Sequence, residues 1–101
     1  MGKVELTSDP KRVFNFIMII FLLSKEGFKE LESIIHTGKY PVWVSGGVLT
    51  DIEMSTVREK GVDLTSFSYL INPSDDKAIK EALATIAEHH PGERVWLECQ
   101  P

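Results

Sequence analysis

The chain has 101 residues, of which 43% are hydrophobic and 26% charged, and its formal net charge is −4. This length fits one domain, 1–101, and the apolar content excludes a chain too polar to build a core. Because the basic residues are scattered and outnumbered, the charge balance argues against nucleic acid as a partner.

The first predicted element is the apolar run Val13–Leu23. Its part Phe14–Leu23 is rich in Ile and Phe, which is typical of a central parallel strand covered on both faces. The run is shorter than the roughly 20 residues that a membrane-spanning helix needs, and Glu5 and Asp9 precede it, unlike a signal peptide. We therefore expect a core strand, no membrane partner and a cytoplasmic location.

Two alternatives concern the N-terminal region. Asp9-Pro10 also suits the start of a helix, so residues 10–23 could form a buried helix instead of a strand. The strand is favoured because the run is short and has no polar helical face. Lys3–Leu6 is a candidate fifth strand at the sheet edge, paired through a turn at Ser8-Asp9-Pro10.

A helix is predicted next, because apolar residues recur at helical spacing and Thr37-Gly38 ends the pattern. Its expected apolar stripe consists of Phe28, Leu31, Ile34 and Ile35. Tyr40–Val44 follows as a second strand, and Ser45-Gly46-Gly47 breaks it.

Thr50 and Glu53 have the spacing of a capping box, which predicts a helix from about residue 51 to Gly61. Val62–Ile71 is the third predicted strand. Its side chains alternate between apolar and small polar, so one of its faces is expected to be less buried.

The third helix is predicted to begin after the turn Asn72-Pro73-Ser74, with Ser74 as the N-cap and two acids in the first turn. It ends at His90-Pro91-Gly92, and Arg94–Cys99 is the last strand. The apolar face of this helix is formed by Ala78, Ile79, Ala82, Leu83, Ile86 and Ala87.

The element order β-α-β-α-β-α-β predicts an α/β fold. We expect a small three-layer sandwich, with a mostly parallel sheet of four or five strands flanked by three helices. Trp43 and Trp96 fall in strands expected to be central, and are therefore predicted to be core residues.

The predicted ligand-binding loop follows the second strand. Ligands of parallel sheets bind beyond the carboxyl ends of the strands, glycines let backbone amides approach a ligand, and the following helix adds free N–H groups. An anion or a phosphorylated metabolite would suit this loop. The alternative is a tight turn that needs glycine for its dihedral angles. The candidate binding residues are Ser45, Gly46, Gly47 and Thr50.

The segment Val42–Val48 with Gly61-Val62-Asp63 resembles the late strand-loop-strand segment of phosphate-binding (β/α)₈ barrel enzymes. The resemblance implies a phosphate held by Ser45-Gly46-Gly47. It covers about 22 residues, whereas a full barrel has roughly 250. The second phosphate loop of those enzymes has no counterpart, because Ser66–Tyr69 continues as strand.

Titratable residues predict no metal site and no cofactor. His36, His89 and His90 fall at helix ends, where a cation suits the helix dipole, and Asp75-Asp76 lie in a first turn for the same reason. The single Cys99 can form neither an internal disulfide nor a multi-cysteine metal site.

No enzyme signature occurs, and enzymatic activity stays an open question because it would need Ser45, Asp51 or His36 to converge. The sequence favours a non-enzymatic module that binds a protein partner, with a second copy at an exposed sheet edge as one candidate partner and Tyr69 as a candidate contact residue. The alternative is a small-ligand domain that uses the Ser45–Thr50 loop.

Overall fold

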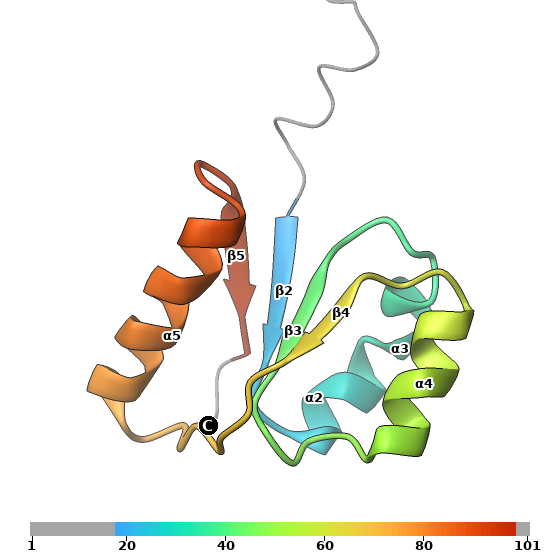
Figure 1. The fold of residues 1–101 in the computed structure, drawn as a ribbon, viewed down its shortest axis with the longest axis horizontal. Helices are drawn as coiled ribbons and strands as arrows, with labels where there is room; N and C mark the ends of the chain where they lie inside the picture. The colour runs from blue at the N-terminus through green and yellow to red at the C-terminus, as the bar shows by residue number, and fades with distance from the viewer. Residues whose placement is uncertain (1–17, 99–101) are drawn as a thin grey trace, which may run out of the picture.

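The computed structural model describes residues 18–98, which form a parallel sheet between two layers of helices (Figure 1). The elements in chain order are β2 (Met18–Leu22), α2 (Lys25–Glu30), α3 (Glu32–Ile35), β3 (Val42–Val44), α4 (Asp51–Glu59), β4 (Leu64–Ser66), α5 (Asp76–His89) and β5 (Arg94–Leu97).

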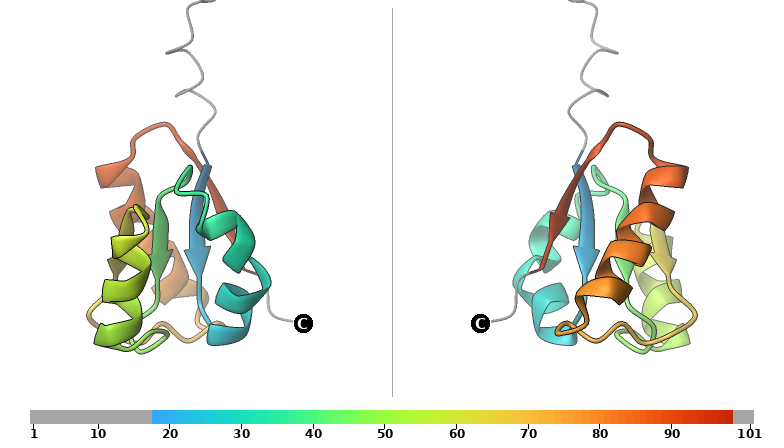
Figure 2. Two further views of the ribbon diagram at one scale, coloured as in Figure 1. Left: turned by 90° about the vertical axis from the view of Figure 1, so that its right-hand side faces the viewer. Right: turned by 90° about the vertical axis from the view of Figure 1, so that its left-hand side faces the viewer.

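The sheet has four strands in the order β4-β3-β2-β5, and all three neighbouring pairs are parallel. The predicted α/β fold with a parallel sheet is therefore confirmed. From β2 the chain adds β3 and then β4 on one side, and it then crosses back to place β5 on the other side. This reversal puts α5 on one face of the sheet and α2, α3 and α4 on the other (Figures 1 and 2).

Each face of the sheet carries its own core. Ile20 and Leu22 join the core beneath α2, α3 and α4, whereas Ile19 and Phe21 join the core beneath α5. All four side chains are fully buried. The prediction of a central strand covered on both faces is thus confirmed over residues 18–22, and the alternative of a helix is wrong there.

The helix starts follow their capping residues. The Thr50 hydroxyl accepts a hydrogen bond from the Glu53 amide at 3.1 Å, and the Glu53 carboxylate accepts one from the Thr50 amide at 2.9 Å, so the predicted capping box is confirmed. The N-cap of α5 is Asp75, not Ser74, because the Asp75 carboxylate accepts from the Ala78 amide at 3.1 Å. The Ser74 amide donates to the Asn72 side chain at 2.8 Å in the turn before the helix. The turn before α5 is therefore one residue longer than predicted.

The third strand is much shorter than the predicted Val62–Ile71, since β4 ends at Ser66. The chain that follows β4 crosses the carboxyl end of β3. There the Gly46 amide donates to the Tyr69 carbonyl at 2.9 Å, and the Ile71 amide donates to the Ser45 hydroxyl at 2.7 Å. The Phe67 amide still bonds to the Val44 carbonyl of β3, and the bonds of Tyr69 and Ile71 to the loop take the place of further strand pairing.

Three residues predicted to be buried are exposed: Trp96, Ile34 and, on the predicted apolar face of the third helix, Ala87. Trp43 is buried as predicted, but Trp96 is 40% exposed because β5 is an edge strand and not a central one. Ile34 is 43% exposed, whereas Ile35 is buried in the same core as Phe28, because the helix breaks at Leu31 and only Ile35 of α3 then faces the core.

The predictions for Lys3–Leu6, for residues 10–17 and for Cys99 lie outside the described residues. Within 18–22, however, β3 and β5 occupy both edges of β2, so these residues have no free edge for a hairpin partner. Among the helices of residues 18–98, none is long and apolar enough to cross a bilayer.

Candidate functional site

The predicted loop Ser45–Thr50 lies beyond the carboxyl end of β3, as expected. Ser45 is fully buried, and its amide donates to the Leu22 carbonyl at 3.0 Å while its hydroxyl accepts from Ile71. The Gly46 amide is bonded to the Tyr69 carbonyl. The amide and hydroxyl of Ser45 and the amide of Gly46 are therefore engaged inside the fold.

Gly46 and Gly47 are each required by a different property of the backbone. A Cβ at Gly46 would lie 2.6 Å from the Tyr69 carbonyl oxygen and 2.9 Å from that of Phe67, so only glycine admits the chain that crosses here. Gly47 is exposed and has a φ of +86°, a left-handed conformation that favours glycine. A close backbone contact therefore accounts for Gly46, and the backbone conformation alone accounts for Gly47.

Thr50, the fourth predicted binding residue, caps α4, and the acids Asp51 and Glu53 stand in the first turn of that helix. An anion at this helix start would meet their negative charge. The anion-binding role of the loop stays a prediction, and the other residues of the fold suggest two further places to look.

The first place is the crevice between the carboxyl ends of β2 and β5, where the strand order reverses. Open α/β sheets commonly bind ligands at such a reversal. Here Glu98 fills it: one carboxylate oxygen accepts from the amides of Leu23 at 2.8 Å and Ser24 at 3.0 Å, and the other accepts from the Ser24 hydroxyl. Glu98 is 8% exposed.

Glu98 is built into the start of α2. The Ser24 hydroxyl that donates to Glu98 also accepts from the Gly27 amide at 3.1 Å, which makes Ser24 the N-cap of α2. A Cβ at Gly27 would overlap the Glu98 carboxylate. The chain thus places its own carboxylate where an anionic ligand would otherwise meet amides, and like charge disfavours such a ligand there.

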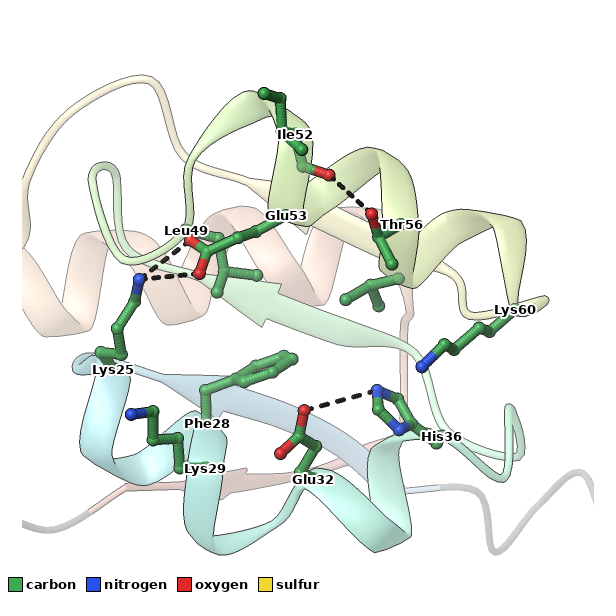
Figure 3. Close-up of a pocket in the computed structure, with 11 residues that line it drawn as sticks. Lys25, Phe28, Lys29, Glu32, His36, Leu49, Ile52, Glu53, Thr56 and Lys60 are labelled. Carbon is green, nitrogen blue, oxygen red and sulfur yellow. Dashed lines mark hydrogen bonds and ion pairs between the residues drawn. The ribbon is translucent and has the colours of Figure 1, made fainter.

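The second place is a groove between α2 and α3 on one side and α4 on the other (Figure 3), here called the helix groove. Its cavity volume is about 230 Å³. Its lining residues are Lys25, Phe28, Lys29, Glu32, His36, Leu49, Ile52, Glu53, Thr56, Val57 and Lys60.

The helix groove has an apolar floor. Phe28, Leu49 and Val57 lie beneath it, and all three belong to the core of this face of the sheet. Figure 3 shows the Phe28 ring between the two helical walls. Ile52 on α4 adds an apolar side chain that is 80% exposed. The floor is thus part of the buried core, and the rim is exposed to solvent.

Charged side chains border this floor. The Lys25 ammonium bridges from α2 to both carboxylate oxygens of Glu53 on α4, at 2.9 and 3.0 Å. The hydrogen bond from the Thr50 amide, and then the Lys25 ammonium, hold the pKa of Glu53 below its ordinary value. Glu53 is therefore ionised at neutral pH, and this ion pair ties the two walls at one end.

The other end of the helix groove carries His36 and Lys60. Figure 3 shows Lys60 reaching from the end of α4 toward His36, whose Nε2 lies 3.9 Å from a Glu32 oxygen. Within residues 18–98, Lys29 and Lys60 have no acidic ion-pair partner within 4 Å. Two ammonium groups at the groove are thus available to a ligand.

The helix groove was not predicted from the sequence. The predicted helical pattern begins at Phe28 and so does not place Lys25 on a helix, whereas α2 begins at Lys25 and puts it one helical turn from Lys29. Nothing in the sequence places Lys60 opposite these two lysines. His36 stands at the end of α3 as predicted, but it also lines the groove. His89 and His90 end α5 as predicted, and their rings pack 5.4 and 6.1 Å from the ring of Trp43.

No protein-family model, no curated protein and no solved structure matches this chain. The site is therefore interpreted from its own geometry.

Proposed function

We propose that this chain is a binding domain whose helix groove holds a small molecule with an apolar body and an anionic group. The observation that carries the proposal is the pairing of an apolar floor with lysines on both walls, of which Lys29 and Lys60 have no acidic partner among the described residues. This arrangement is local, because the chain as a whole has a net charge of −4.

The size of the groove supports a small ligand. Pockets for drug-sized molecules usually have about 300 to 1,000 Å³, whereas this one has about 230 Å³. A single ring or a short branched chain would cover Phe28, Leu49 and Val57. Its anionic group would then reach the lysines at the rim, where charge-assisted hydrogen bonds orient a ligand.

The proposal keeps an anionic ligand, as predicted for the Ser45–Thr50 loop. It places this ligand in the groove between the helices and not at the carboxyl end of β3. It assigns a binding role and no reaction. The carboxylate and imidazole side chains of the groove, those of Glu32, Glu53 and His36, lie on its walls, and its floor is apolar.

Titration calorimetry with benzoate, phenyl phosphate and neutral benzamide tests the proposal. We expect the two anions to bind and benzamide to bind about tenfold more weakly or not at all, because a charge-assisted hydrogen bond contributes about 1.5–3 kcal/mol. Affinity for the anions should fall as salt is raised, since the lysines are exposed to solvent.

Lys60→Gln should weaken binding of both anions about tenfold, and Lys80→Gln, on the exposed side of α5, is the matched control that should leave it unchanged. Equal losses for the two variants would place the anion outside the helix groove. If neither anion binds, or if benzamide binds equally well, the proposal is wrong.

A second function, protein interaction, is favoured by a different observation. Trp96 is 40% exposed on an edge strand, and buried aromatic anchors commonly dominate protein interfaces.

A further inference from the structure

The two edges of the sheet differ in how they are protected. At the β4 edge, the Asp63 carbonyl and the Phe67 amide bond to β3, so the groups of Leu64 and Ser66 between them point outward. The Arg58 side chain covers that edge by donating to the Leu64 carbonyl at 2.9 and 3.1 Å. A charged side chain on an outward carbonyl blocks the addition of a further strand.

The β5 edge has no such cover among residues 18–98. The Glu98 amide bonds to the Phe21 carbonyl of β2 at 3.0 Å, so Glu98 and Trp96 direct their backbone groups inward. By the alternation of a strand, Val95 and Leu97 direct theirs outward. β5 pairs with β2 alone within the described sheet (Figure 2).

We propose that β5 pairs antiparallel with β5 of a second copy of this chain. The two strands are related by a two-fold axis that passes between the two Trp96 residues. The proposal is independent of the ligand proposed for the helix groove. It joins the two four-stranded sheets into one continuous sheet and keeps α5 of both copies on the same face.

The backbone selects the register. In an antiparallel ladder, two residues that exchange both hydrogen bonds must each direct their backbone groups toward the partner strand. Val95 opposite Leu97 of the second copy meets this condition twice, once on each side of the axis. This register uses every outward amide and carbonyl of Val95 and Leu97, and it leaves Trp96 opposite itself in a non-hydrogen-bonded pair, with Cα atoms about 4.5 Å apart.

The side chains fit the same register. Trp96 pairs with Ile20 in the parallel ladder, so it projects on the face of α2 and α3, where it is 40% exposed. Two such rings meeting across the axis would bury one another, and aromatic cross-strand pairs stabilise antiparallel ladders. Val95 and Leu97 are only partly buried beneath α5 and would each gain a neighbour.

Charge is also complementary. The register places Arg94 opposite Glu98 of the second copy, two residues to either side of the axis. Arg94 is exposed and makes no ion pair with another described residue. The Glu98 carboxylate is 8% exposed and is already bonded to the amides of Leu23 and Ser24, so Arg94 of the second copy would be attracted by its charge without replacing those bonds.

Sedimentation velocity over a range of concentrations tests the proposal. We expect a concentration-dependent dimer, and Trp96→Lys should weaken it at least about tenfold because it places two like charges opposite one another. Leu70→Lys is the matched control, since Leu70 is 75% exposed and lies in the connection between β4 and α5, outside the proposed strand pair. A dimer that survives Trp96→Lys would place the interface elsewhere and overturn the proposal.

Disulfide trapping tests the axis. In a Cys99→Ser background, Trp96→Cys should form a crosslinked dimer under mild oxidation, because only a residue on a two-fold axis meets its own copy. Leu70→Cys should not. Failure of Trp96→Cys to crosslink in a sample that is dimeric by sedimentation would exclude this register.

Amide hydrogen exchange separates a second copy from other occupants of the edge. The amides of Val95 and Leu97 should exchange rapidly in the dilute monomer and become protected as the dimer forms. Protection that is already complete in the monomer would show that another segment of the chain covers the edge, and a chain that stays monomeric would equally overturn the proposal.

Discussion

The polar residues at the carboxyl ends of β2, β3 and β5, here called the carboxyl edge of the sheet, are used differently from those of the helix groove. At the carboxyl edge, Ser45, Ser24 and Glu98 are bonded to neighbouring backbone, and each bond joins two segments of the chain. In the helix groove, Lys29 and Lys60 border an apolar floor and have no acidic partner among the described residues.

This difference shows how a polar residue can be assigned to folding or to binding. A buried polar group must be satisfied within the fold, and its removal then leaves a partner unpaired at a cost of about 1–3 kcal/mol. An exposed charge that has no partner contributes little to stability. We therefore expect variants of the carboxyl edge to change stability, and variants of the helix groove to change binding.

The largest expected effect separates the two glycines. Gly46→Ala should lower the free energy of unfolding by about 3 kcal/mol or more, because its Cβ would collide with the Tyr69 carbonyl. Gly47→Ala should cost only about 1–2 kcal/mol, for its left-handed φ alone. Denaturation in urea measures both; equal losses would show that the chain at Tyr69 moves aside.

Glu98→Ala should lower the free energy of unfolding by about 2 kcal/mol or more, since the amides of Leu23 and Ser24 lose their acceptor. Glu88→Ala, at an exposed residue of α5, is the control and should change the free energy of unfolding by less than about 0.5 kcal/mol.

Gly27→Ala should lower the free energy of unfolding less in the Glu98→Ala background than in the native chain, because the carboxylate that a Cβ at residue 27 would overlap is then absent. If the losses in free energy of unfolding of the two single variants simply add in the double variant, residue 27 and the Glu98 carboxylate do not interact.

Ile52→Ala should affect binding and not folding. The side chain is 80% exposed, so stability should change by less than about 0.5 kcal/mol. Loss of its apolar carbons should weaken the binding of phenyl phosphate about threefold or more. Leu70→Ala, equally accessible but outside the groove, should leave the affinity unchanged; a similar loss for both variants would argue against the helix groove.

The smallest effect is a dependence on pH. The pKa of Glu53 is lowered in the folded chain from its ordinary value of 4.5, so its ionised form stabilises the fold above that pH. As the pH falls through the lowered pKa, this contribution is lost. Glu53→Gln should therefore be less stable than the native chain at neutral pH, with a difference that shrinks in acid. Thermal denaturation across pH measures this, and a constant difference would contradict it.

The prediction of the fold succeeded where local patterns sufficed. The doubly buried run at Met18–Leu22, the capping box of α4 and the amphipathic pattern of α5 each depend on near neighbours in sequence. The prediction failed where contacts between segments distant in sequence set the length or the place of a strand. β4 is short because Ser45 and Gly46 bind the chain at 69–71, and Trp96 is exposed because β5 lies at an edge.

The sequence by itself determined the alternation of strands and helices, and therefore a parallel sheet with helices on its faces, because hydrophobic period and capping act over a few residues. It also marked Gly46-Gly47 as special. Only the tertiary structure decided what the pair does, since the carbonyl of Tyr69 that requires Gly46 lies 23 residues away. The strand order, the carboxylate of Glu98 in its crevice and the lysines of the helix groove depend likewise on contacts between distant segments, which no local pattern contains.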